Sequence, residues 1–485
     1  MPNKSAIYES VQGLVKAKKE KFLGVSDKLW DYAETRFAEH KSAELLAKVL
    51  EEEGYAVERN AGGVETAVVG TWGSGKPVIG FLGEYDALAN LSQAAGEVVK
   101  KPLEEGKPGQ GCGHNLLGAG ALMAATALRD YLKENKLPGT VKFFGCPAEE
   151  GGSGKTYMLR GGAFDGTDIC LTWHPGADNN VLTVSSLANI QCYFHFKGRS
   201  AHAAAAPENG RSALDAVELM NVAGNYLREH VPTTSRLHYA IVNAGGTAPN
   251  VVQAEASVLY LMRAPSLDGV QNIFERICKI AQGAALMTET EVEIDFDKAC
   301  SNYLANITLS DVMNEVMTDL GAAEYTQEDI DFAEKLRATL SEGERNKTAG
   351  RTYNKPDWQE IEEKYDSEAL ATFIHPYHPE LKEVSGGGST DVGDVSWVVP
   401  TAQFYMATAP KNTSAHTWQW VSCGKSGMAH KGTVRAAEIM AATALIAYNN
   451  PEIIENAKAE LNKVLEKTPY SNPIPTHVKP RIVQV

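Results

Sequence analysis

The chain has 485 residues, of which 43% are hydrophobic and 22% charged, a composition typical of a soluble globular protein with more than one domain. Acidic residues exceed basic ones by 61 to 46, and the net charge of −15 provides no basic surface for nucleic acid or an anionic membrane. Residues 1–22 lack the apolar core of a secretory signal, and no apolar run approaches the ~18 residues that span a bilayer, so we expect a cytoplasmic protein.

The first half of the chain alternates between helical and strand-like segments. Helical spacing covers residues 26–53 and 116–135, and strands are predicted at 67–73, 77–87, 140–150 and 168–176. This alternation predicts an α/β fold with a mostly parallel central sheet, whose ligands bind beyond the carboxyl ends of the strands. The polar residues at such ends are Asp86, Glu149, Glu150 and His174.

From residue 186 the pattern changes. The predicted strand, helix, two strands, helix and strand cover residues 188–199, 210–230, 236–246, 254–264, 267–287 and 291–299. The order β-α-β-β-α-β is that of a ferredoxin-like unit, here inserted into the larger domain. We therefore divide the chain into an α/β domain of residues 1–185 and 300–485 and an inserted domain of residues 186–299. Residues 341–360 are predicted to form an exposed loop, and the sequence assigns no role to residues 340–385.

The stretch CPAEEGGSGKT, residues 146–156, ends like a phosphate-binding loop with Gly154, Lys155 and Thr156. The glycine that should open such a loop falls at position 149, which is Glu149. A carboxylate there would direct negative charge at the phosphates, so we exclude nucleotide binding. The paired glutamates need another explanation.

Several side chains of the types that bind metals stand on loops or strand ends: Cys112, His114, Glu149 or Glu150, His174 and His416. Any one of them could be an ordinary packing or surface residue. Together, thiolate, imidazole and carboxylate are the donor set for zinc and related divalent ions. The set is scattered and contains carboxylate, which favours a catalytic centre with an open position, and five donors are enough for two ions.

The two adjacent glutamates can divide the work of such a centre. Neighbouring carboxylates at a strand end point to different sides, so one can bind metal while the other moves protons. We assign Glu150 as the ligand and Glu149 as the general acid/base, although spacing alone leaves that order open.

The motifs GCGHN, PAEEGGSG, TWHPG, GRSAHAA, STDVGDVSW and HTWQ resemble the M20 metallopeptidase/amidohydrolase family, nearly from end to end. The resemblance implies an α/β domain with two divalent metal ions per subunit, Mn²⁺ or Zn²⁺, and an inserted lid that also dimerises. It implies that the catalytic carboxylate is Glu149 and that the metal ligands are Cys112, His114, Glu150, His174 and His416.

One position departs from the pattern of many family members. They carry a histidine two residues before an aspartate, and here GEYDA places Glu84 in the position of that histidine. We therefore expect Asp86 to orient a ligand, and we do not count Glu84 among the ligands.

The resemblance also implies roles for residues outside the metal loops. His202 would reach the site of a partner subunit and polarise the scissile carbonyl. Asn250 and Arg263 would contact substrate, where the Arg263 guanidinium can grip a carboxylate, although a structural ion pair explains it equally well. His430 would be a residue behind a ligand or facing the substrate. The remaining histidines with a structural or surface interpretation are His40, His195, His230, His238, His375, His378 and His477.

The function implied is metal-dependent hydrolysis of a linear amide in an N-acyl amino acid, with p-aminobenzoyl-glutamate, a folate catabolite, as the leading substrate. The alternatives are a dipeptidase-like peptidase with the same catalytic groups and a non-catalytic partner subunit of a hetero-oligomeric hydrolase. We expect a homodimer through the lid, or a complex with a paralogous A subunit, and no nucleic-acid or membrane partner.

Overall fold

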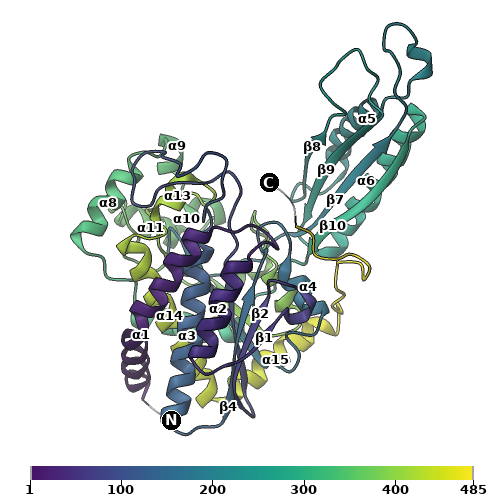
Figure 1. Cartoon of the computed structure of the whole chain (residues 1–485). Helices are drawn as coiled ribbons and strands as arrows, with labels where there is room; N and C mark the ends of the chain where they lie inside the picture. The colour runs from purple at the N-terminus through teal and green to yellow at the C-terminus, as the bar shows by residue number, and fades with distance from the viewer. Residues whose placement is uncertain (1–2, 483–485) are drawn as a thin grey trace.

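The computed structural model describes residues 3–482 and folds them around two β-sheets (Figure 1). The larger sheet has seven strands in the order β1-β2-β4-β3-β5-β11-β6. Its strands are β1 (Ala56–Arg59), β2 (Val68–Ser74), β3 (Val78–Glu84), β4 (Gly139–Cys146), β5 (Ile169–Gly176), β6 (Asn180–Val181) and β11 (Thr401–Ala407). The four consecutive strands β4, β3, β5 and β11 run parallel, whereas the pairs β1–β2, β2–β4 and β11–β6 are antiparallel. The sheet is therefore mixed, and the expected parallel arrangement holds for those four strands.

Both faces of the parallel strands are buried, because successive side chains point to opposite sides. On β3 and β4, Phe81 and Phe143 belong to the core under the long helices, while Leu82 and Phe144 belong to the core on the other face. This double burial explains why the strands read as continuous apolar runs.

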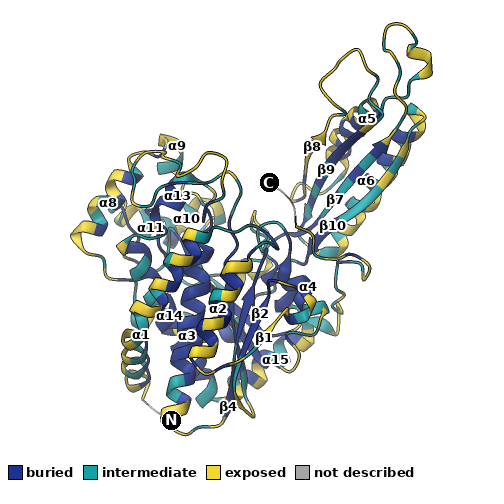
Figure 2. Cartoon of the chain, viewed as in Figure 1, coloured by how far each residue is buried: buried dark blue, intermediate teal, exposed yellow. Residues whose placement is uncertain are grey.

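The long helices beside the large sheet are α1 (Lys4–Tyr32), α2 (His40–Glu52), α3 (His114–Glu134), α7 (Ile307–Leu320), α14 (Gly427–Asn449) and α15 (Pro451–Leu465). Four of them, α2, α3, α7 and α14, contact one face of the large sheet, and α1 and α15 pack on these helices (Figure 2). α3 is buried almost all round, since its small residues let it lie between the sheet and α1 and α14. The expected helix over 26–53 is wrong at its centre. The chain leaves α1 at Ala33 in a left-handed conformation, and the Glu34 carboxylate then accepts hydrogen bonds from the first turn of α2.

The remaining short helices lie beyond the ends of the strands or on the opposite face. They are η1 (Ala61–Gly63), α4 (Gly154–Arg160), α8 (Gln327–Arg337), α9 (Glu342–Arg345), α10 (Ala349–Tyr353), α11 (Pro356–Lys364), η4 (Pro379–Glu383), α12 (Val392–Ser396) and α13 (Trp418–Cys423). The expected exposed loop at 341–360 is wrong, because this segment contains α9, α10 and part of α11. Trp358 is 4% exposed and packs against Tyr353 and His375, so one aromatic anchor fixes an otherwise polar segment.

The smaller sheet has the order β10-β7-β9-β8 with every pair antiparallel, and it extends away from the large sheet in Figure 1. Its elements in chain order are β7 (Ala188–Lys197), η2 (Pro207–Asn209), α5 (Ala213–Leu227), η3 (Arg228–His230), β8 (Arg236–Asn243), β9 (Glu255–Ala264), α6 (Leu267–Thr288) and β10 (Glu291–Cys300). α5 and α6 pack on one face of this sheet. No helix within residues 3–482 is both long and apolar enough to cross a membrane.

Among the contacts that link the smaller sheet to the rest of the molecule are a buried ion pair and a set of backbone hydrogen bonds. The buried guanidinium of Arg36 makes two hydrogen bonds, of 3.0 and 3.1 Å, to the Asp297 carboxylate on β10. The strand-like segment at 185–187, which leads into β7, hydrogen-bonds to the glycine-rich segment at 384–388. The site described below lies at this junction.

Candidate active site

A cavity of about 620 Å³ lies where the carboxyl ends of the parallel strands face the base of the smaller sheet. Its wall on the large-sheet side includes Glu84 at the end of β3, Glu149 and Glu150 after β4, and His174 on β5. Its wall on the small-sheet side includes Arg263 on β9. The volume is ordinary for a small-molecule site.

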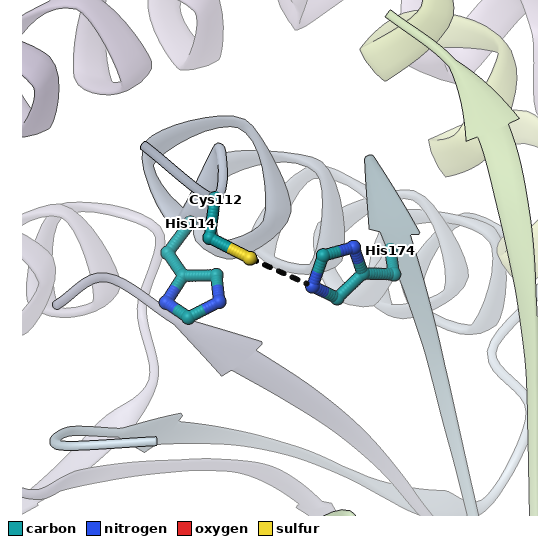
Figure 3. Close-up of side chains that lie close together, drawn as sticks. All are labelled: Cys112, His114 and His174. Carbon is teal, nitrogen blue, oxygen red and sulfur yellow. Dashed lines mark hydrogen bonds between the residues drawn. The ribbon is translucent and has the colours of Figure 1, made fainter. Parts of the chain in front are cut away.

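The GCGHN loop carries two of the predicted ligands, Cys112 and His114, and Cys112 lines the cavity. Gly113 has φ +78°, and a Cβ atom there would lie 3.0 Å from the Pro175 side chain, so glycine is required for this turn. The turn places Cys112 just before α3 and His114 as its first residue. Figure 3 shows both side chains converging with His174, whose Nε2 lies 3.5 Å from the Cys112 Sγ atom.

The Nδ1 atoms of His114 and His174 each make a hydrogen bond that fixes the ring. His114 Nδ1 lies 2.9 Å from Asp86 Oδ1, and His174 Nδ1 donates to the Pro175 carbonyl at 2.8 Å. These bonds leave both Nε2 atoms facing the cluster, as in histidines that bind metals. The other Asp86 oxygen accepts the Glu150 backbone N–H at 2.9 Å, so Asp86 joins the two loops.

A second group of donors shares Cys112 with the first. His416 Nε2 lies 3.1 Å from Glu150 Oε1, and the donor atoms of Cys112, Glu150 and His416 all lie within 4.8 Å of one another. His416 has φ +65°, a strained conformation for a residue other than glycine, and its N–H donates to the Gly111 carbonyl at 2.7 Å. The backbone thus holds His416 against the GCGHN loop.

A third group contains a residue that sequence reasoning excluded. Glu84 Oε2 lies 3.2 Å from His114 Nε2, and Glu149 Oε2 lies 4.0 Å from the same nitrogen. Glu84 is 2% exposed. Its position at the end of a strand, two residues before Asp86, is the only sequence signal that points to it.

Three buried atoms in this cluster that could bind a metal ion have no hydrogen-bond partner among the described residues: Glu84 Oε2, His114 Nε2 and Glu150 Oε1. Buried polar atoms left without a partner cost free energy, and proteins avoid them unless something else binds there. Imidazole, thiol and carboxylate donors aimed at common points fit divalent cations such as Zn²⁺ and Mn²⁺.

The pKa values of the two adjacent glutamates are shifted in opposite directions. Burial, together with the nearby charges of Glu84 and Glu150, raises the pKa of Glu149 well above its usual value. Burial also acts on Glu150, but His416 and His114 outweigh it and lower its pKa to about 2. A pair of carboxyl groups driven apart in this way is typical of an acid/base group beside a permanently ionised one.

The thiol of Cys112 is not an activated nucleophile by itself. Burial and the charge of Glu150 raise its pKa well above the usual value. A thiol in this state reacts poorly, whereas a bound cation would favour the thiolate. The surroundings of Cys112 therefore favour metal binding over covalent catalysis.

Three of the other predicted residues lie outside the cavity wall. His202 and Asn250 are exposed neighbours on the β7–α5 and β8–β9 loops, where the Ala203 N–H donates to the Asn250 carbonyl at 3.1 Å. The strand register places these loops at the end of the small sheet remote from the large sheet. His430 contacts Asp27 Oδ1 at 2.9 Å and does not line the cavity, so this geometry gives no support to a substrate contact.

Arg263 is the predicted substrate residue that does line the cavity. Its Nη1 donates to Ser389 Oγ at 3.1 Å, and its buried Nε has no hydrogen-bond partner within the described chain. Among residues 3–482 no carboxylate forms an ion pair with it, so the structural ion pair considered from sequence is not formed within that part of the chain.

Residues 80–419 match the description Peptidase family M20/M25/M40, and the chain belongs to this family of hydrolases that act on amide bonds. It is 45% identical to one subunit, designated B, of the p-aminobenzoyl-glutamate hydrolase of Escherichia coli, over 98% of both chains. It is 28% identical to a Xaa-Arg dipeptidase of Mus musculus, over 93% of this chain and 91% of the relative. A dinuclear metal binding peptidase of the M20 family from Bacillus subtilis has a similar fold, with a TM-score of 0.53 and 17% identity over 89% of this chain and 99% of the other.

Proposed function

We propose that this protein hydrolyses the amide bond of an N-acyl amino acid and that p-aminobenzoyl-glutamate is its substrate. The observation that carries the proposal is the cluster of Cys112, His114 and His174 with the unbound acid Glu149 beside it. The relative that is 45% identical over nearly the whole chain is a p-aminobenzoyl-glutamate hydrolase subunit, which supports this choice of substrate.

Two divalent ions, Zn²⁺ or Mn²⁺, would be held by Cys112, His114, Glu150, His174 and His416. Such ions activate water and polarise an amide carbonyl. Cys112 belongs to two of the donor groups, one with His114 and His174 and one with Glu150 and His416, which is the arrangement expected of a shared ligand.

Glu149 would move the proton. Burial, with the charges of Glu84 and Glu150, raises its pKa well above the usual value, which makes its carboxylate a stronger base, and it lines the cavity. It would take a proton from water and deliver it to the nitrogen of the departing amino acid. Asp86 would act indirectly, by keeping His114 and the Glu150 loop in place.

The cavity offers separate surfaces for the two halves of the substrate. The free hydrogen-bonding capacity of Arg263 suits a carboxylate of the glutamate, which a guanidinium can bind through two parallel hydrogen bonds. Aromatic side chains also line the cavity and suit an aroyl ring: Tyr353, Trp358, Tyr405 and Trp420.

We further propose that residues 186–299 form a ferredoxin-like lid and that residues 1–185 and 300–485 form the catalytic domain. The element order and the strand order β10-β7-β9-β8 support this division. The lid also carries large exposed apolar side chains on α5 and on the edge strand β8, which suit an interface with a second copy or with a paralogous A subunit: Leu219, Val222, Tyr226, Tyr239, Ile241 and Val242. In such an assembly His202 and Asn250 would reach the partner's cavity.

A dipeptidase activity is the second candidate. The 28% identical relative is a Xaa-Arg dipeptidase, and Asp178 on the cavity wall could pair with a basic side chain.

A substrate panel tests the proposal directly. The purified chain, loaded with Zn²⁺ or Mn²⁺, would be assayed on p-aminobenzoyl-glutamate, an indole-acyl amino acid and an Xaa-Arg dipeptide. We expect p-aminobenzoyl-glutamate to give the highest kcat/KM and Arg263→Met to raise its KM. Preference for the dipeptide would favour the second candidate, and no activity on any substrate would favour a non-catalytic partner subunit.

A mixing experiment tests the shared site. His202→Ala and Glu149→Gln chains should each be inactive alone and regain activity when mixed, because one intact site can then form. Absence of rescue in a mixture that forms mixed dimers would contradict a role for His202 across the interface.

A further inference from the structure

Lys155, the lysine of the loop that resembles a phosphate-binding motif, is fully buried at the start of α4. A buried ammonium is costly unless it is paired. Its Nζ lies 2.5 Å from Glu84 Oε1 and 2.6 Å from Asp391 Oδ1, and the second Asp391 oxygen accepts the Lys155 backbone N–H at 2.8 Å. Both carboxylates are at most 2% exposed. Lys155 is therefore unavailable to a phosphate and is fixed by two acids.

The arrangement directs the free oxygen of Glu84 into the metal cluster. Lys155 occupies Oε1, and Oε2 is left without a hydrogen-bond partner within the described residues, 3.2 Å from His114 Nε2. An ion pair that served stability alone would need no free oxygen facing the cavity, and apolar side chains could replace it.

The other partner of Lys155 belongs to a second segment that lines the cavity. Asp391 ends the glycine-rich segment whose residues 386–391 line the cavity. The same segment is bonded to the chain leading into β7, through the Gly386 N–H to the Ser185 carbonyl at 2.6 Å and the Leu187 N–H to the Gly388 carbonyl at 2.8 Å. One side chain thus connects the end of β3 to the wall beside the small sheet.

We propose that Lys155 is a positioning residue of the metal centre: it holds Glu84 as an additional oxygen donor and fixes the glycine-rich wall through Asp391. This inference rests on the proposed metal-dependent function. It assigns a role to Glu84 that is distinct from the five predicted ligands.

A double-mutant cycle on metal affinity tests the proposal. The variants are Lys155→Met, Glu84→Gln and the combination, and Zn²⁺ affinity is measured by competition with a chelator. We expect each single variant to weaken binding of at least one ion about 10- to 100-fold, the range for residues that orient ligands. The combination should be no weaker than Glu84→Gln alone, because Lys155 acts through Glu84.

Two further readouts separate positioning from folding. The melting temperature of each metal-free chain reports stability, and the visible spectrum of the Co²⁺-loaded chain reports ligand geometry, which a purely structural residue would leave unchanged. Lys411→Met is the matched control, since Lys411 is also buried but lies outside the cavity wall and contacts the Tyr365 carbonyl. It should retain the metal affinity and the Co²⁺ spectrum of the wild type.

Each outcome supports or overturns the inference. Wild-type affinity and spectrum in folded Lys155→Met, or independent effects of the two substitutions, would overturn it. If Lys155→Met does not fold, Glu84→Gln decides: unchanged affinity overturns the proposal, and weakened affinity with an altered spectrum supports it. A wild-type chain that binds no divalent ion would overturn the proposed function as well, which distinguishes that failure from the failure of Lys155 alone.

Discussion

Removal of the Cys112 thiol should affect both metal positions at once. Cys112 is the one residue common to the group with His114 and His174 and the group with Glu150 and His416. In Cys112→Ala each group keeps only two protein donors, whereas His174→Ala or His416→Ala leaves the other group of three intact. We therefore expect the content of bound metal to fall from about two ions per chain to nearly none in Cys112→Ala, and to about one in either histidine variant.

The assay is elemental analysis of each variant after dialysis against a buffered Zn²⁺ concentration, together with turnover of p-aminobenzoyl-glutamate. Turnover by Cys112→Ala should fall about 100-fold or more, because losing a direct ligand costs more than losing a residue behind it. Cys423→Ala is the control, since Cys423 is buried in a separate apolar cluster. Two ions retained by Cys112→Ala, or one ion lost from it and both from His416→Ala, would refute the shared-ligand arrangement.

Three further predictions concern other parts of the molecule. Glu149→Gln should lower kcat about 10²- to 10⁴-fold while elemental analysis shows normal metal content, and loss of metal from this variant would identify Glu149 as a ligand instead. Arg36→Met should lower the free energy of unfolding, measured in urea, by about 3–5 kcal/mol, because it leaves the buried Asp297 carboxylate without its cation. Arg59→Met should cost at most about 1 kcal/mol, because its partners Glu44 and Glu51 are exposed. Equal costs would contradict this contrast. Burial opposes ionisation of Glu53, but Lys18, Lys21 and Arg129 lower its pKa from 4.5 to about 2. The stabilising contribution of the Glu53 carboxylate should therefore be complete above pH 4.5 and disappear as the pH falls through 2. The difference in urea midpoint between wild type and Glu53→Gln should shrink over that interval, and a constant difference would show that the charge is not responsible.

The sequence by itself determined the features that depend on local pattern. Apolar periodicity gave the α/β alternation, and polar residues at strand ends predicted where Glu149, Glu150 and His174 would gather, because parallel strands bring their carboxyl ends to one edge. The glycine-flanked GCGHN motif predicted that Cys112 and His114 could serve one site, since Gly113 adopts a conformation that favours glycine. The segment at 341–360 was wrongly predicted because its polar composition concealed a single buried anchor, Trp358.

Only the tertiary structure decided which of these groups meet. Lys155 contacts Glu84 and Asp391, which are 71 and 236 residues away in the chain, and no local pattern reports a contact of that range. Glu84 was not counted among the ligands because it stands where many family members carry a histidine, and no local pattern shows that its Oε2 lies 3.2 Å from the buried His114 Nε2. Burial raises the pKa of both Glu149 and Glu150, but His416 and His114 outweigh it at Glu150 and lower that pKa to about 2. These neighbours are a property of the packed chain that two adjacent identical residues cannot reveal.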